Sequence, residues 1–178
     1  MTRTGTAAVL IVGLLSLTAC DDLKGPSGDK APAQAPAETA FSHEISGDLS
    51  GNYLPVTSIS VDGYRVKSLY LGQGADFTAW EAGSKSGAFG PVMIEFEKID
   101  GGDVIRVLPR SYAVTDGRVR FEGSDARLGQ VAFNGTLDAD ALATARRNLG
   151  DEGPVLSGTL RAGGTAFGGQ TFRWYGGD

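Results

Sequence analysis

The sequence predicts an all-β domain, an antiparallel β-barrel or β-sandwich of about eight to ten strands with one short helix. Three observations support this fold class. Glycine makes up 27 of the 178 residues, well above its usual share of about 7%. The glycines fall between short apolar runs rather than in one block, and several of those runs alternate apolar with polar residues. Antiparallel β-domains are punctuated in this way.

Four segments predict tight turns between neighbouring strands. The first is Asp62-Gly63, and an Asp-Gly pair suits a hairpin turn whose two central residues have positive φ. The others are 100–103, Asp116-Gly117 and Gly163-Gly164. Runs rich in strand-forming residues flank each turn, so each pair of strands should be antiparallel.

The runs beside these turns alternate with a period of two. In 118–122, valine and phenylalanine take one face and the charged residues take the other. Phe172 and Trp174 likewise share a face that Arg173 does not. Half-buried strands show this alternation because successive side chains point to opposite sides of the sheet.

A five-residue pattern of apolar, polar, glycine, polar and leucine occurs at 45–49, 133–137 and 156–160. One interpretation is a structural repeat in a closed barrel, where glycine lets a strand bend or a large side chain pack over it. The other is chance, because glycine-rich strands resemble one another by composition.

One helix is expected over residues 139–149. Asp138 can cap its start, Arg146 and Arg147 fall in its last turn, and Gly150 follows its end. We expect it to lie across an open end or face of the sheet, on an apolar stripe formed by Leu142, Ala145 and Leu149.

The N-terminus has the composition of a removable export signal. Residues 1–19 begin with a single charged side chain, Arg3, and continue as an uncharged apolar run over 7–19. This run is too short to span a bilayer as a helix, which takes about 20 residues. A positive start, a short apolar middle and small residues at the end are typical of a segment that is cleaved after export.

The export signal ends in Leu17-Thr18-Ala19-Cys20. This motif resembles the lipobox of bacterial lipoprotein precursors. In that family the cysteine sulfur receives a diacylglyceryl group, a peptidase cuts before the cysteine, and the new amine is usually acylated. The resemblance implies lipidation of Cys20 and a durable membrane anchor, because several acyl chains hold far better than one. The alternative is a buried free cysteine at the end of an N-terminal anchor helix.

Residues 20–40 are expected to form the lipidated cysteine and a flexible tether rich in proline and alanine. Fully extended, this tether would reach roughly 60 Å. Asp21 and Asp22 resemble the signal that keeps enteric lipoproteins in the inner membrane, which favours that membrane, facing the periplasm, over the outer membrane. Their other interpretation is the polar start of a linker. Residues 41–178 then form a single β-rich domain.

Charge and cysteine content narrow the choice of function. The chain carries a formal charge of −5, which becomes −6 when residues 1–19 are removed. Nucleic-acid binding needs a basic face, so this charge argues against it. Cys20 is the only cysteine, so the domain has no internal disulfide and relies on its core.

Few residues suggest catalysis, and no cofactor or metal is expected. His43 is the only histidine, which is too few for a zinc site, and it is interpreted as a structural residue. Glu95 and Glu97 share one side of a strand, where a solvated face is the simpler interpretation than acid–base chemistry. Ser84-Lys85 lies in a glycine-rich segment that is interpreted as a loop.

The sequence leaves three functions open. The first is a non-enzymatic, lipid-anchored bacterial envelope lipoprotein that binds or scaffolds a protein partner in the periplasm. The second is a periplasmic β-barrel that carries an apolar small molecule, and the third is an envelope hydrolase using Ser84 or the carboxylates. Trp80, Trp174 and Tyr175 are the candidate binding surface, because aromatic side chains suit sugars, apolar ligands and protein partners.

Overall fold

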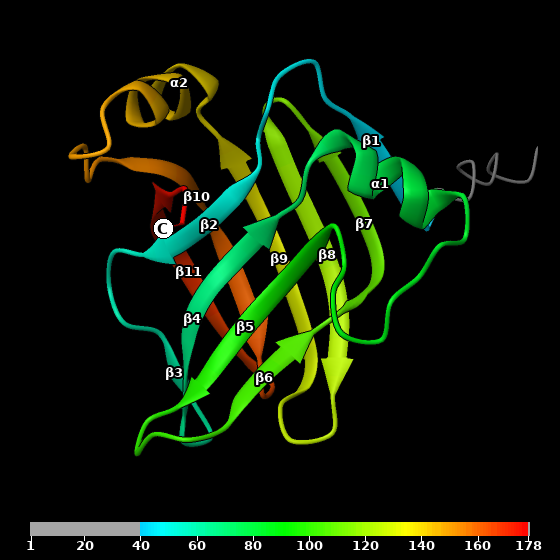
Figure 1. Cartoon of the computed structure of the whole chain (residues 1–178). Coiled ribbons are helices and arrows are strands. Elements are labelled where there is room, and N and C mark those ends of the chain that lie inside the picture. The colour runs from blue at the N-terminus through cyan, green and yellow to red at the C-terminus, as the bar shows by residue number, and fades with distance from the viewer. Residues whose placement is uncertain (1–39, 178) are drawn as a thin grey trace, which may run out of the picture. The chain divides into compact units, whose positions relative to one another are not determined.

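The computed structural model describes residues 40–177, which form one curled β-sheet with two short helices (Figure 1). The expected all-β fold is confirmed. In chain order the elements are β1 (Phe41–Glu44), β2 (Gly51–Pro55), β3 (Ser60–Val61), β4 (Tyr64–Leu71), α1 (Gly74–Glu81), β5 (Val92–Lys98), β6 (Val104–Val107), β7 (Pro109–Thr115), β8 (Arg118–Asp125), β9 (Gly129–Leu137), α2 (Ala139–Arg147), β10 (Pro154–Ala162) and β11 (Thr165–Tyr175).

The strands follow the order β1-β7-β8-β9-β10-β11-β2-β4-β5-β6, with β3 paired to β4, and the sheet curls into a half-barrel. Only β1 and β7 pair in parallel among these neighbours; the other pairs are antiparallel. All four predicted hairpins are present, as β3–β4, β5–β6, β7–β8 and β10–β11. At the first turn Asp62 and Gly63 both have positive φ, at 51° and 81°.

The interior of the half-barrel is filled by its own side chains. Large aromatic residues come from strands all along the sheet and from α1, and each is less than 2% exposed: Tyr53, Phe77, Phe96, Phe121 and Phe172. Aliphatic side chains at the alternate positions of the strands complete the same cluster. The fold therefore rests on apolar burial, which is its largest favourable contribution.

The glycine pattern is a structural pairing in two of its three copies. Gly135 of β9 lies directly opposite Gly158 of β10, and the ring of Phe133 packs over both. A Cβ atom added to Gly135 would stand 2.5 Å from that ring. The third copy, 45–49, lies outside the sheet between β1 and β2. The expected role of glycine beneath a large side chain is thus present where β9 meets β10.

The predicted helix is α2, and the carboxylate of Asp138 caps it by accepting a hydrogen bond of 2.9 Å from the backbone N–H of Ala141. Leu142 and Ala145 are buried, as expected. Leu149 was expected on the same stripe but is 83% exposed. That expectation is wrong because the helix ends at Arg147, so Leu149 lies beyond it.

The second helix, α1, was not expected from the sequence. It follows β4 and is capped by Gln73, whose backbone N–H donates to the carboxylate of Asp76 at 2.8 Å. The strands β1 and β6 are the two edges of the sheet. Helix α1 contacts the first edge, and the loop after α1 contacts the second. Phe77 of α1 stacks on His43 of β1, and Phe89 of the loop lies under the guanidinium of Arg106 on β6.

The predicted export signal (1–19), the lipidation site Cys20 and the tether through residue 39 lie outside the described residues. Within residues 40–177, neither helix has the length and hydropathy needed to cross a membrane. The chain enters the described domain at Ala40, whose carbonyl accepts a hydrogen bond of 2.9 Å from the backbone N–H of Tyr112 on β7.

Candidate functional site

The three aromatic residues predicted as a binding surface occupy different environments. Trp80 is only 6% exposed and packs beside Phe41, so it belongs to the core and not to the predicted binding surface. Trp80 is buried because α1 packs against β1, where its ring meets Phe41. Trp174 is half-buried, and Tyr175 is 38% exposed. Trp80 lies on α1, far along the fold from β11, which carries the other two (Figure 1).

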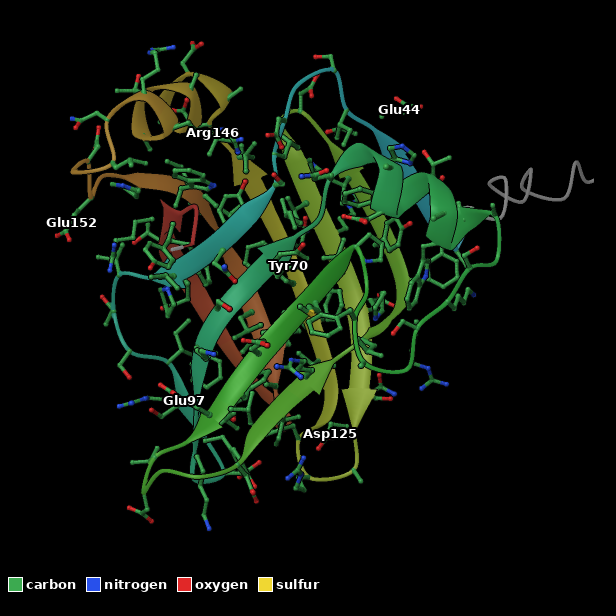
Figure 2. The ribbon with its side chains drawn as sticks, in the orientation of Figure 1. Glu44, Tyr70, Glu97, Asp125, Arg146 and Glu152 are labelled. Carbon is green, nitrogen blue, oxygen red and sulfur yellow. The ribbon has the colours of Figure 1, made fainter. Side chains whose placement is uncertain are left out.

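Trp174 is held by polar contacts that fix its ring. Its indole Nε1–H donates to the carbonyl of Ser50 at 3.0 Å, and the guanidinium of Arg146 lies 5.0 Å from the ring centre. Arg146 extends from α2 in Figure 2 and also donates to the carbonyl of Ser50 and to Asp48. This cluster fastens α2 to the start of β2. Because β11 pairs with both β10 and β2, it is not a free sheet edge.

A polar cluster joins α1 to the first strand and to β7. The Nδ1 nitrogen of His43 lies 2.9 Å from Oε1 of Glu81, and the hydroxyl of Tyr112 donates to the same oxygen at 3.0 Å. Burial and the adjacent Glu81 carboxylate raise the pKa of Tyr112 above its ordinary value, so its hydroxyl remains a donor. The contacts fit the structural role expected for His43.

Replacing Tyr112 by phenylalanine should lower the free energy of unfolding by about 1 kcal/mol, the typical net value of one hydrogen bond. The ring and its edge-on contact with Phe77 remain, so the change isolates the hydroxyl. Urea unfolding of the full-length protein measures it. The control is Tyr70→Phe, whose hydroxyl has no hydrogen-bond partner within the described part of the chain. Equal losses in the two variants would contradict the role of the Glu81 contact.

The carboxylates and the serine considered for hydrolysis are not assembled into one site. Ser84 lies in the exposed loop after α1, where its backbone N–H bonds to the carbonyl of Ala79. Glu97 is paired with Arg65 at the lower end of β5 (Figure 2). Within residues 40–177 there is also no cluster of three or more His, Cys, Asp or Glu side chains that could hold a metal ion.

Glu95 departs from the solvated face that the sequence suggested. It is 7% exposed and lies between two cations, with Oε1 2.6 Å from Nε of Arg106 and Oε2 3.2 Å from Nζ of Lys67. Burial favours the neutral carboxyl, but the hydrogen bonds from Arg106 and Lys67 outweigh it and hold the pKa of Glu95 below its ordinary value. An acceptor fixed in this way is suited to holding strands together.

A hollow on the outer face of the sheet is called the groove. It crosses β1, β7, β8, β9 and β10, is open to solvent, and has a volume of about 790 Å³. Strand register places its side chains in rows. One row is Ser42, Ala113, Arg120, Asn134 and Thr159; the next is Ser111, Glu122, Ala132 and Arg161. A smaller adjoining hollow continues along Arg118, Thr136 and Ser157.

Short side chains such as Ala113 and Ala132 form the floor of the groove, and Arg120 and Arg161 lie at its sides. Ala132 leaves space between the long side chains of Glu122 and Arg161, and Ala113 leaves space beside Arg120. Sequence reasoning missed this site. The alternation of 118–122 did place the charged residues on one face, but the register of two more strands, β9 and β10, was needed to bring Arg161 toward them.

Comparisons of the chain with protein-family models, with curated proteins and with solved structures gave no match. The groove and the polar clusters are therefore interpreted from the residues of this chain alone. Of these features, the groove is the only one described that combines an open hollow with several charged and hydrogen-bonding side chains, and it is the candidate functional site.

Proposed function

We propose that this chain is a lipid-anchored lipoprotein of the bacterial envelope that binds a protein partner in the periplasm and has no enzymatic role. The observation that carries the proposal is the motif Leu17-Thr18-Ala19-Cys20 at the end of a short apolar run. The proline- and alanine-rich residues after Cys20 supply a spacer, and the domain follows. An inner-membrane location is favoured by Asp21 and Asp22.

The domain's packing supports binding at the surface over carriage of an apolar molecule. A carrier needs an apolar cavity that buries most of its ligand. Here the interior positions hold Tyr53, Phe96 and Phe121, each at most 1% exposed. The hollow with convergent polar side chains lies on the outside of the sheet. A surface role is also supported by the separation of Ser84 from the carboxylates of β5.

Replacing Cys20 by alanine should abolish lipid attachment and leave an uncleaved precursor, because the thiol is the acceptor of the lipid. Metabolic labelling with a radioactive fatty acid should give no labelled protein. The mature protein, in contrast, should be labelled and should sediment with membranes. Normal cleavage and retained membrane binding of the Cys20→Ala protein would contradict the proposal.

The matched control keeps the cysteine and changes its neighbour. Asp21→Ala should still be labelled and cleaved, because Cys20 is intact. Sucrose-gradient separation of the two membranes then tests location: we expect the wild type in the inner membrane and the Asp21→Ala protein shifted toward the outer membrane. An unchanged distribution would count against the inner-membrane signal while leaving the anchor intact.

A further inference from the structure

We propose that the groove binds a small zwitterion of the amino acid class, whose ammonium group is held by Glu122 and whose carboxylate is held by Arg161. This ligand is additional to the protein partner proposed above, and its site depends on neither that partner nor the lipid anchor. Three observations carry the inference: the opposite charges of the two side chains, the spacing between them, and the small residue that separates them.

Glu122 and Arg161 present opposite charges within the groove. Both are exposed lining residues. Oε2 of Glu122 accepts a hydrogen bond of 3.3 Å from the hydroxyl of Ser111, and neither Glu122 nor Arg161 has an ion-pair partner within the described part of the chain. An ionised carboxylate only accepts hydrogen bonds and a guanidinium only donates them. The pair is therefore suited to a ligand that carries both a cationic donor and an anionic acceptor.

Arg120 is not part of this site. It lies two residues from Glu122 on the same face of β8, but it already takes part in an interaction of its own, so its charge is not available to a ligand. The two groups that remain, Glu122 and Arg161, carry one charge of each sign. A ligand with two oppositely charged ends and no net charge is complementary to them.

Strand register sets the distance between the two charges. Glu122 of β8 lies opposite Ala132 of β9, which lies opposite Arg161 of β10, and these three strands are adjacent in the sheet (Figure 1). Side chains stand roughly perpendicular to a sheet, so two strand spacings of about 4.8 Å place the charged groups roughly 10 Å apart. A charge-assisted hydrogen bond of about 2.8 Å at each end leaves about 4 Å between the two charged groups of the ligand. This separation suits a single amino acid, because the two termini of an extended peptide lie farther apart.

Ala132 provides the space for the ligand between the two charges. Its methyl group is half-buried on the outer face of β9, where the carbon atoms of a ligand can pack against it. Asn134 follows on the same face of β9 and also lines the groove, so its amide can hydrogen-bond to either end of the ligand. The groove, of about 790 Å³, continues past Ser111 and Ala113, which leaves room for the side chain of the ligand.

The test is isothermal titration calorimetry of the full-length protein in a non-ionic detergent, with alanine as the probe. We expect saturable binding at one site per chain. N-acetylalanine lacks the ammonium group and alaninamide lacks the carboxylate. Each should bind about tenfold more weakly, because one charged side chain of the site then has no partner. Equal binding of alanine and N-acetylalanine would indicate a simple anion site and would overturn the proposal.

Two substitutions remove the charges of the site one at a time. Glu122→Gln and Arg161→Gln should each weaken alanine binding about tenfold. Both side chains are exposed, so the fold should be retained. The matched control is Arg147→Gln, which changes an exposed arginine on α2 outside the groove and should leave the affinity unchanged. An equal loss in Arg147→Gln and Arg161→Gln would indicate a general effect of charge and would reject the site.

Ala132→Leu tests the space between the two side chains without changing any charge. The larger side chain fills this space, so alanine binding should be lost. Ala166→Leu is the control, because Ala166 of β11 lies on the other side of Arg161 and is not among the described residues that line the groove. That variant should bind alanine as the wild type does. Retained binding by the Ala132→Leu protein, or no saturable binding by the wild type, would overturn the proposal and would leave the Cys20 anchor untouched.

Discussion

Gly135→Ala is expected to lower the free energy of unfolding by about 2–3 kcal/mol, the upper part of the range for overpacking a core. The added methyl group would stand 2.5 Å from the Phe133 ring and 2.6 Å from the carbonyl oxygen of Ser157. The second contact is to backbone of the neighbouring strand, which moves only if β9 and β10 separate. The Phe133 ring is itself confined by an edge-on contact with Phe172 at 5.5 Å.

Urea unfolding of the variants provides the measurement, and Gly168→Ala is the control. Gly168 also lies in a strand, but its added Cβ would meet nothing within 4 Å and its φ is not positive. That variant should change stability by less than about 0.5 kcal/mol. Combining Gly135→Ala with Phe133→Leu should give less than the sum of the single losses, because leucine removes the ring contact. Strict additivity, or an unaffected Gly135→Ala protein, would rule out this packing arrangement.

Glu95→Gln is expected to lower the free energy of unfolding by about 2 kcal/mol at neutral pH. Removing one member of a buried ion pair commonly costs about 3–5 kcal/mol. The loss is smaller here because Lys67 and Arg106 are 47% and 44% exposed and regain hydration. The control, Glu97→Gln, breaks a pair with Arg65 in which both side chains are a third or more exposed, and should cost less than about 1 kcal/mol.

The contribution of Glu95 also depends on pH in a definite direction. Its pKa is lower in the folded protein than in the unfolded chain, so the folded state binds the proton less readily. The stabilisation is therefore complete above the unfolded pKa of about 4.3 and is lost as the pH falls through the folded value. The stability difference between the wild type and Glu95→Gln, measured by urea unfolding from pH 7 to pH 3, should shrink toward acid. A difference that stays constant or grows would contradict the ion-pair role.

The sequence predicted the hairpins and α2 because their signals are local. Asp62-Gly63 fixes a turn through its own backbone angles, and Asp138 fixes a helix start through one side-chain oxygen. The signal of α1 is weaker. It has a capping pair in Gln73 and Asp76, but Gly74 and Thr78 are poor helix formers and only two of its residues are buried. Packing of Phe77 against β1 and β7 stabilises this helix, whose intrinsic helix propensity is low.

The candidate site could not be predicted because it depends on strand register. The alternation rule places Glu95 on the outer face of β5 but does not say what lies beside it. A register shift between Val66 and Ser68 brings Lys67 near Glu95, and β6 supplies Arg106 from the other side. The groove is likewise assembled across strands that are distant in sequence. The sequence of each strand shows which side chains share a face. It does not show which residues of the neighbouring strands lie beside them.

The parallel pairing of β1 with β7 has a mechanical consequence under the proposed anchoring. A pull from the membrane on the anchored domain would enter it at Phe41 and would first be resisted by the four-residue β1. That strand is held by its hydrogen bonds to β7 and by the contacts of Phe41 and His43 with α1. Detaching it would also remove Ser42 from the end of the groove. Under tension β1 would then separate from β7 before the rest of the half-barrel unfolds, and the shape of the groove would change with it.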